Sequence, residues 1–124
     1  MESKMKKATF FICLIYSAFA LTASTNQAER FLPGIVSTSA TEFSNALSKD
    51  GKSFYFTRFI SGKGHIMVTR LVNGRWTTAE TVSFSGNYSD YDQTFSPDGK
   101  QLFYCSNRPI NGGNRAKMDR HDIW

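Results

Sequence analysis

Short apolar and aromatic runs, separated by turn residues, make up most of the chain from residue 41 onward. Two aromatic runs, 54–56 and 102–104, each follow an Asp-Gly pair, and residues 65–71 alternate so that Ile66 and Val68 share one face. Runs of aromatic and β-branched residues bounded by Gly, Asn and Asp are typical of strands joined by tight turns. The pattern therefore predicts an all-β fold of antiparallel strands.

One turn sequence occurs twice, 48 residues apart. In an Asp-Gly turn, Asp tolerates a left-handed backbone and Gly takes a positive φ without steric cost. A second copy at a fixed spacing predicts a repeat architecture rather than a single hairpin. The matched residues are Ser48 with Ser96, Asp50 with Asp98, Gly51 with Gly99, and Lys52 with Lys100, while Pro97 sets φ at the entry of the second turn.

The first unit is predicted to span residues 41–84 and the second residues 90–124. Stacked four-stranded antiparallel sheets are the architecture of a β-propeller, so we predict one whole blade and an incomplete one. The second unit lacks the adaptations by which the terminal repeat of an array normally caps it. This favours the N-terminal part of a longer array over the alternative, a small self-standing β domain. The first unit is expected to have strands at 42–48, 53–58, 65–71 and within 77–84, a glycine-rich loop at 61–64 and a hairpin turn at Asn73-Gly74; the second has a long loop at 107–120.

The N-terminus has the layout of a secretory signal peptide, predicted over residues 1–28. Three lysines lie among the first seven residues, and an almost wholly apolar run follows at 8–20. That run is shorter than the ~20 residues of a membrane span, so we expect export to the periplasm or cell surface and no span after cleavage. Residues 29–40 form a leader, and the expected cuts follow Ala20, Ala23 or Ala28.

Charge and cysteine content narrow the function classes. The net charge of +5 falls to +3 when residues 1–28 are removed, so the basic balance indicates export and no nucleic-acid partner. The chain has two cysteines, of which the mature chain keeps only Cys105, so no internal disulfide is expected. Cys105 lies in an aromatic strand pattern, which predicts a buried and unreactive thiol.

No catalytic, cofactor-binding or metal-binding residue is predicted. The chain has no Gly-x-Ser-x-Gly nucleophile motif and no Gly-rich phosphate loop. The paired His65 and His121 precede the third strand of each unit, without further zinc ligands. Five acids could serve as calcium ligands, but their spacing fits a role in turns or pairing with Arg108 and Arg120 better. Two of them are expected on one side of a strand. The five are Asp90 and Asp92, which form that pair, and Asp98, Asp119 and Asp122.

Several motifs together resemble the WD40-like (PD40) repeat of TolB-type β-propellers. The second unit matches closely, whereas the first has Lys49 in place of Pro. Segments 32–38, 74–76 and 84–90 further resemble exported bacterial propeller-repeat proteins. The residues that carry the resemblance are Ser96-Pro97-Asp98-Gly99-Lys100, then Asn107-Arg108, then Asp122-Ile123-Trp124.

The resemblance implies a propeller that binds a protein, peptide or glycan, with no catalysis in this chain. The alternative is an accessory propeller domain of a prolyl-oligopeptidase-like serine peptidase, with a catalytic domain beyond Trp124. A carbohydrate-active propeller would need paired carboxylates in its central channel, and the sequence neither supports nor excludes them.

Overall fold

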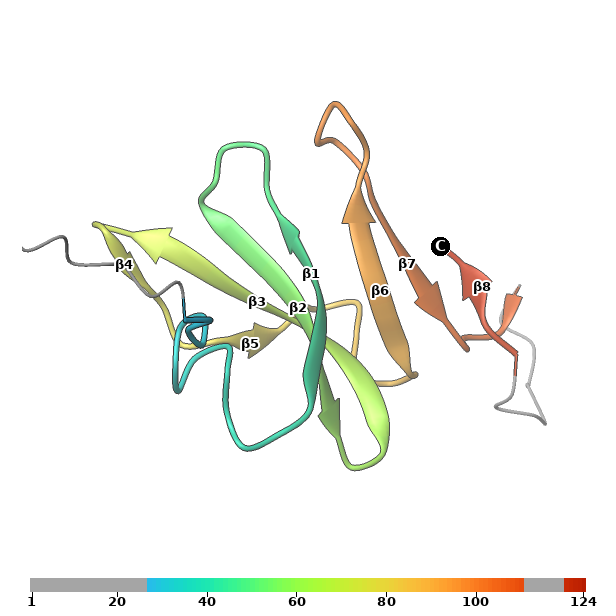
Figure 1. The fold of residues 1–124 in the computed structure, drawn as a ribbon. Coiled ribbons are helices and arrows are strands. Elements are labelled where there is room, and N and C mark those ends of the chain that lie inside the picture. Colours follow the sequence, from blue (N-terminus) through green and yellow to red (C-terminus); the bar gives the residue numbers. More distant parts are fainter. Residues whose placement is uncertain (1–26, 111–119) are drawn as a thin grey trace, which may run out of the picture.

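A computed structural model describes residues 27–110 and 120–124, and within them the chain is all-β, with two antiparallel sheets (Figure 1). This confirms the predicted all-β, antiparallel fold. The predicted signal peptide and most of the 107–120 loop lie outside the described residues. The first sheet contains β1 (Glu42–Leu47), β2 (Ser53–Ile60), β3 (Lys63–Val72), β4 (Arg75–Trp76) and β5 (Glu80–Thr81), and the second sheet contains β6 (Asp90–Phe95), β7 (Leu102–Ser106) and β8 (Asp122–Ile123).

The first sheet has the order β1-β2-β3-β4, and β5 pairs separately with β3. The strand predicted within 77–84 is confirmed as the two-residue β5, and a further short strand that was not predicted, β4, precedes it. Between them the Thr77 amide still donates to the Arg70 carbonyl oxygen at 2.9 Å, and side chains add further bonds to β3. The Thr69 hydroxyl donates to the Thr77 carbonyl oxygen at 2.6 Å, and the Arg70 amide donates to the Thr77 hydroxyl at 3.1 Å.

Two tight turns connect the long strands of the first sheet. Asn73 and Gly74 have φ values of 50° and 75°, which confirms the predicted two-residue hairpin turn. Ser61 and Gly62, with φ of 51° and 78°, make a second turn of the same kind. The predicted loop at 61–64 is too long, since β3 already begins at Lys63.

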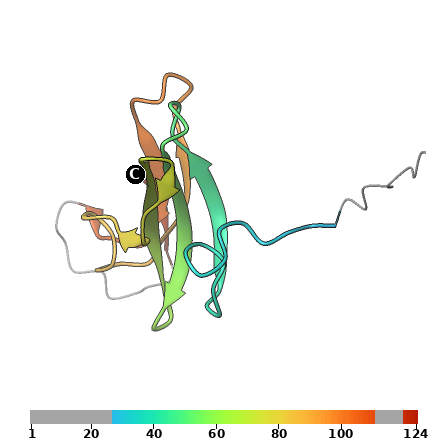
Figure 2. The same cartoon turned by 90° about the vertical axis from the view of Figure 1, so that its left-hand side faces the viewer.

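Neighbouring residues of a strand point to opposite faces of the sheet. Each face of the first sheet packs against a different part of the chain. We call one the leader face, formed by Phe54, Phe56 and Met67, on which Leu32, Ile35 and Val36 pack. The other is the inner face, formed by Tyr55, Thr57, Ile66 and Val68, which meets the second sheet. In Figure 1 the leader segment lies to the lower left of β1 and the second sheet to the right of the first, and residues 27–30 extend away from both sheets (Figure 2).

The two sheets approach closely where β6 crosses the first sheet. A Cβ atom on Gly64 would lie 2.7 Å from the carbonyl oxygen of Asp90, which is closer than real Cβ contacts allow. Gly64 is therefore needed for the spacing between the sheets, not for a turn. The Thr57 hydroxyl and the Ser44 carbonyl both bond the side chain of Gln93, at 2.9 and 2.6 Å, and lock the sheets in register.

Candidate functional site

The repeated turn residues form matching hydrogen-bond networks at the β1–β2 and β6–β7 turns. Ser48 donates to the Asp50 carboxylate at 2.5 Å, and the Lys52 amide donates to the same oxygen at 3.0 Å. Ser96, Asp98 and Lys100 repeat these contacts at 2.5 and 3.1 Å. These bonds lower the pKa values of both aspartates, so the two carboxylates stabilise turns.

The expected positive φ of the turn glycines is confirmed, with 70° at Gly51 and 76° at Gly99. The two aspartates do not use the left-handed conformation that Asp tolerates. Asp50 and Asp98 act instead as acceptors for a hydroxyl and an amide two residues away on either side. This is the Asx-turn chemistry that makes Asp frequent in turns.

A β-bulge also recurs at the 48-residue spacing. Ser44 in β1 and Asp92 in β6 have φ of 47° and 56°, and the strand register shifts at both places. The Ser44 hydroxyl donates to the Asp92 carboxylate, so the two bulges contact each other across the sheets. The prediction that Asp90 and Asp92 lie on one side of a strand is wrong, because the bulge separates a buried Asp90 from an exposed Asp92.

The first acid–arginine pair joins β1, β2 and the leader segment. Arg58 contacts Glu42 through Nε and Oε1 at 2.9 Å, and its Nη2 donates to the Ile35 carbonyl oxygen at 2.9 Å. The guanidinium also lies over the Phe56 ring, 5.2 Å from its centroid. Burial alone would raise the pKa of Glu42, but hydrogen bonds from Thr38 and the charge of Arg58 outweigh it and lower that pKa.

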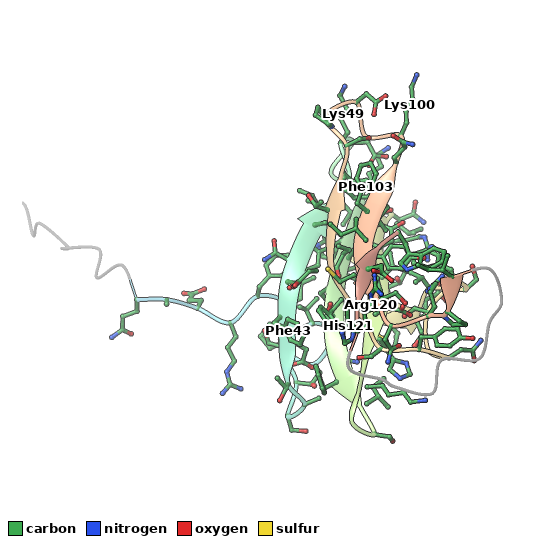
Figure 3. The ribbon with its side chains drawn as sticks, turned by 90° about the vertical axis from the view of Figure 1, so that its right-hand side faces the viewer. Phe43, Lys49, Lys100, Phe103, Arg120 and His121 are labelled. Atoms are coloured by element: carbon green, nitrogen blue, oxygen red, sulfur yellow. The ribbon has the colours of Figure 1, made fainter. Side chains whose placement is uncertain are left out.

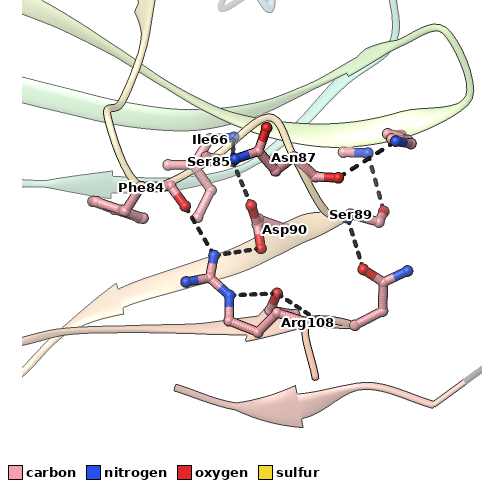
Figure 4. Close-up of polar contacts among 11 residues, drawn as sticks. Ile66, Phe84, Ser85, Asn87, Ser89, Asp90 and Arg108 are labelled. Atoms are coloured by element: carbon pink, nitrogen blue, oxygen red, sulfur yellow. Dashed lines mark hydrogen bonds and ion pairs between the residues drawn. The ribbon is translucent and has the colours of Figure 1, made fainter. Parts of the chain in front are cut away.

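The second pair, Asp90 with Arg108, is more deeply buried (Figure 4). Arg108 Nη2 contacts Asp90 Oδ1 at 2.9 Å and donates to the Phe84 carbonyl oxygen at 2.9 Å. The Ser85 hydroxyl donates to the other Asp90 oxygen at 2.7 Å. Of the five acids expected to hold turns or to pair with Arg108 or Arg120, Asp90 is the one that pairs with Arg108.

Aromatic rings surround the same guanidinium. Arg108 lies 4.9 Å from the Tyr104 centroid, 5.5 Å from Trp124 and 5.8 Å from Tyr88. Arg108 is therefore placed for cation–π contacts with these aromatic rings. Asn107, the other residue of this motif, accepts a 2.9 Å bond from the Ser89 amide. Both motif residues thus hold the link between the sheets and are not displayed toward solvent.

The two pairs are built alike and show that the repeat starts before residue 41. In each, an acid opens the first strand of a sheet, and an arginine within two residues of the end of the second strand bonds a carbonyl of the preceding segment. Val36 packs on Phe56, as Phe84 stacks on Tyr104 with centroids 5.1 Å apart. The leader segment therefore occupies the place that residues 82–85 occupy in the second copy.

The β7–β8 pairing corrects the alignment of the third strands. Ser106 pairs with Asp122, as Arg58 pairs with His65, so Asp122 and not His121 corresponds to His65. Ile123 then corresponds to Ile66. His121 packs beside Tyr91, with ring centroids 5.0 Å apart.

The described residues hold no group of three or more His, Cys, Asp or Glu that could bind a metal ion. Asp122 lies 3.7 Å from Arg120, which confirms that predicted pairing, and Asp119 lies outside the described residues. Burial, with a smaller effect of the Asp92 carboxylate, raises the pKa of Cys105, so little of this thiol is ionised at neutral pH. The polar groups described above stabilise the fold, and none is arranged as an acid–base or nucleophile pair.

A groove of about 350 Å³ on the leader face is the candidate binding site. Phe31, Phe43, Phe54 and Phe56 form most of its walls, and Asn45 lies exposed at its rim. The remaining lining residues are Val36, Ser37, Glu42 and Ser44. The sequence did not predict this groove. The apolar residues on both faces of β2 predict that each face is covered, but they do not predict that residues 31–36 cover only part of one face.

A second apolar surface lies on the far side of the second sheet, which we call the open face. It contains Phe103, Cys105 and Ile123, and the side chains of Phe103 and Ile123 are 39% and 76% exposed. Figure 3 shows Phe103 on this side of the molecule, below the two turns that carry Lys49 and Lys100. The two apolar surfaces therefore lie at opposite ends of the two-sheet stack.

Comparisons with protein-family models, curated proteins and solved structures found no match for this chain. Among residues 27–110 and 120–124, no helix has the length and apolar character needed to cross a bilayer. The fold and the contacts above therefore define the class of protein: an all-β chain of two similar, stacked antiparallel sheets.

Proposed function

We propose that this chain is an exported binding scaffold of the WD40-like, TolB-type β-propeller kind, with no catalysis of its own. The observation that carries the proposal is the recurrence of one contact set. The Ser-Asp turn, the left-handed bulge and the acid of each acid–arginine pair recur 48 residues apart, and the two arginines, Arg58 and Arg108, lie 50 residues apart. In these units the polar residues stabilise the turns and the contacts between sheets. This is typical of repeat proteins that serve as recognition scaffolds, in which each unit covers its neighbour.

The groove on the leader face is the binding surface of this scaffold. Its walls are chiefly aromatic, and its single acid, Glu42, is already bonded to Arg58 and Thr38. Few polar groups are left to receive the hydroxyls of a sugar. Of the three partner classes that the repeat implies, the groove therefore favours an apolar protein or peptide segment over a glycan.

Arrays of peptides and of oligosaccharides, probed with the full chain and with Asn45→Arg, test this proposal. We expect peptides with aromatic or aliphatic residues to bind, and the charged side chain at the groove rim to weaken binding about tenfold or more. Val72→Asp is the matched control, because Val72 is exposed but lies outside the groove. Binding to oligosaccharides alone, or peptide binding unchanged by Asn45→Arg, would contradict the proposal.

Export is tested separately by the mature N-terminus. Expression of the full chain in a bacterium, followed by mass spectrometry of the exported protein, should give a cut after Ala20, Ala23 or Ala28. A protein that keeps its first 20 residues and stays in the cytoplasm would contradict this part of the proposal.

A further inference from the structure

The aromatic walls of the groove on the leader face support one another. Phe31 of the leader segment contacts the Phe54 ring with centroids 4.7 Å apart, and the Trp76 ring with centroids 6.5 Å apart. Phe54 in turn lies 6.2 Å from Phe56, a lining residue that is almost fully buried. Because each ring is held by the next, the walls are in place before a ligand binds, and little ordering is needed on binding.

The main hydrogen-bond acceptors at the groove are already bonded within the chain. The Glu42 carboxylate accepts bonds from the amide and the hydroxyl of Thr38 and from Arg58 Nε. The Ser44 carbonyl oxygen accepts a 2.6 Å bond from the Gln93 side chain. An N–H group of a bound segment that is buried without an acceptor loses its bond to water and weakens binding. The groove therefore favours a segment with few N–H groups.

The edge of β1 borders the groove but provides no regular ladder for an added strand. Among the described strands β1 pairs only with β2, and residues 42–45 line the groove. An exposed strand edge can bind a peptide as a further strand through its backbone N–H and C=O groups. Here the register shifts between Phe43 and Asn45, and Ser44 has a φ of 47°. Because such a bulge interrupts pairing along an edge, a ligand in the β conformation is disfavoured.

We propose that the groove binds a proline-rich segment in the polyproline II conformation. A proline residue has no backbone N–H group, so it needs no acceptor from the groove, and its ring packs on aromatic side chains. The polyproline II helix has no internal hydrogen bonds and is populated before binding, so the segment loses little conformational entropy. This inference rests on the proposed function, since it names the class of peptide that the same groove takes.

The size and the charge of the groove agree with such a segment. Its volume of about 350 Å³ is at the small end for ligand sites, which suits a short extended chain better than a helix about 10 Å across. Among the described lining residues only Glu42 is charged, and it is paired with Arg58, so an uncharged segment is the complement. The exposed Asn45 amide can donate to a carbonyl oxygen of the segment.

Fluorescence anisotropy of the full chain with two labelled peptides tests the proposal. One peptide is an oligoproline of about nine residues, or about three turns of the polyproline II helix, and the other has the same length and alternates Ala with Leu. We expect the oligoproline to bind at least about tenfold more tightly. Phe31→Leu keeps an apolar wall but removes a ring. It should weaken oligoproline binding about tenfold and change binding of the Ala-Leu peptide by about twofold or less.

Phe103→Leu is the matched control, because Phe103 is 39% exposed and lies outside the groove. It should bind both peptides like the unchanged chain, and circular dichroism should show the same β signal in both variants. Equal or tighter binding of the Ala-Leu peptide by the unchanged chain, or oligoproline binding that Phe31→Leu leaves unaltered, would overturn the inference. If only the Ala-Leu peptide binds, the inference alone is overturned, whereas failure of both peptides to bind would contradict the proposed function as well.

Discussion

The two sheets share one construction and differ in what covers them. The first sheet is covered by the leader segment on one face and by the second sheet on the other. Within residues 27–110 and 120–124, the second sheet is covered on the face toward the first, while Phe103 and Ile123 on its other face are exposed. As a consequence, Ile66 is 0% exposed, whereas the corresponding Ile123 is 76% exposed. In a repeat, the burial of a residue is set by its neighbouring unit as much as by its own strand.

The two acid–arginine pairs also differ in how deeply their neighbours bury them. Asp90 is fully buried between the sheets, whereas the Glu42 side chain is 12% exposed beside the leader segment. Both arginines bond a carbonyl of the segment before their sheet. The pair between the sheets should therefore be the more important one for stability, and substitutions can test this.

The largest expected effect is that of Asp90→Ala. It leaves the Arg108 guanidinium buried without its carboxylate, and removing one partner of a buried pair costs about 3–5 kcal/mol. Glu42→Ala, the matched change in the first sheet, should cost about 1.5–3 kcal/mol, because its site is partly solvated. Urea denaturation of both variants measures the difference. An equal or larger loss for Glu42→Ala would show that the two pairs are not ranked by burial.

The next effect compares the isoleucines directly. Ile66→Ala should lower the free energy of unfolding by about 2–5 kcal/mol, since it opens a cavity in the core between the sheets. Ile123→Ala should change it by about 0.5 kcal/mol or less in the monomer. Thermal and urea unfolding at low protein concentration report both values. A similar cost at both positions would mean that the open face is covered in the monomer.

A smaller effect separates Thr57 from Cys105. Thr57→Val removes the hydroxyl that bonds Gln93 and leaves a buried amide oxygen without that donor, at a cost of about 1–3 kcal/mol. Cys105→Val, at the corresponding position of the open face, breaks no hydrogen bond between the sheets and should be nearly neutral. Equilibrium unfolding again provides the measurement, and a neutral Thr57→Val would refute the role assigned to the Gln93 contact.

The smallest effect is acid sensitivity at the turns. The folded chain lowers the pKa values of Asp50 and Asp98 below 3.8, so the unfolded chain takes up protons at a higher pH. Their contribution to stability is present above that value and is lost as the pH falls through the lower, folded values. Unfolding midpoints recorded from neutral pH downward should fall less steeply for the double variant Asp50→Asn with Asp98→Asn. If the unfolding midpoint of the double variant falls with pH as steeply as that of the unchanged chain, the two turn aspartates do not cause the acid sensitivity.

Much of the fold follows from local sequence. The aromatic runs at 54–56 and 102–104 form β2 and β7, and Asn73-Gly74 forms a tight turn, because each signal lies within a few residues. Pairing of the acids with Arg108 and Arg120 was also expected, although the sequence did not assign Asp90 to Arg108. The bonds from the two arginines to the preceding segments span 22 to 24 residues and depend on how the strands pack.

What the sequence could not predict depends on contacts between units. The left-handed bulges at Ser44 and Asp92 have no glycine to mark them, and only their contact across the sheets explains them. The groove arises because the leader covers part of one face, which depends on packing and not on periodicity. The single-residue error in aligning His121 arose because a long loop precedes β8, so that only strand pairing fixes the register.

Gly64 has a consequence for the geometry of stacked sheets. Its missing side chain lets the first sheet approach the Asp90 carbonyl oxygen, and a Cβ atom at this position would force one of the two sheets to shift. In the stacked repeat that we propose, a shift at this one contact would change the angle between two neighbouring sheets, and with it the path of every sheet beyond them.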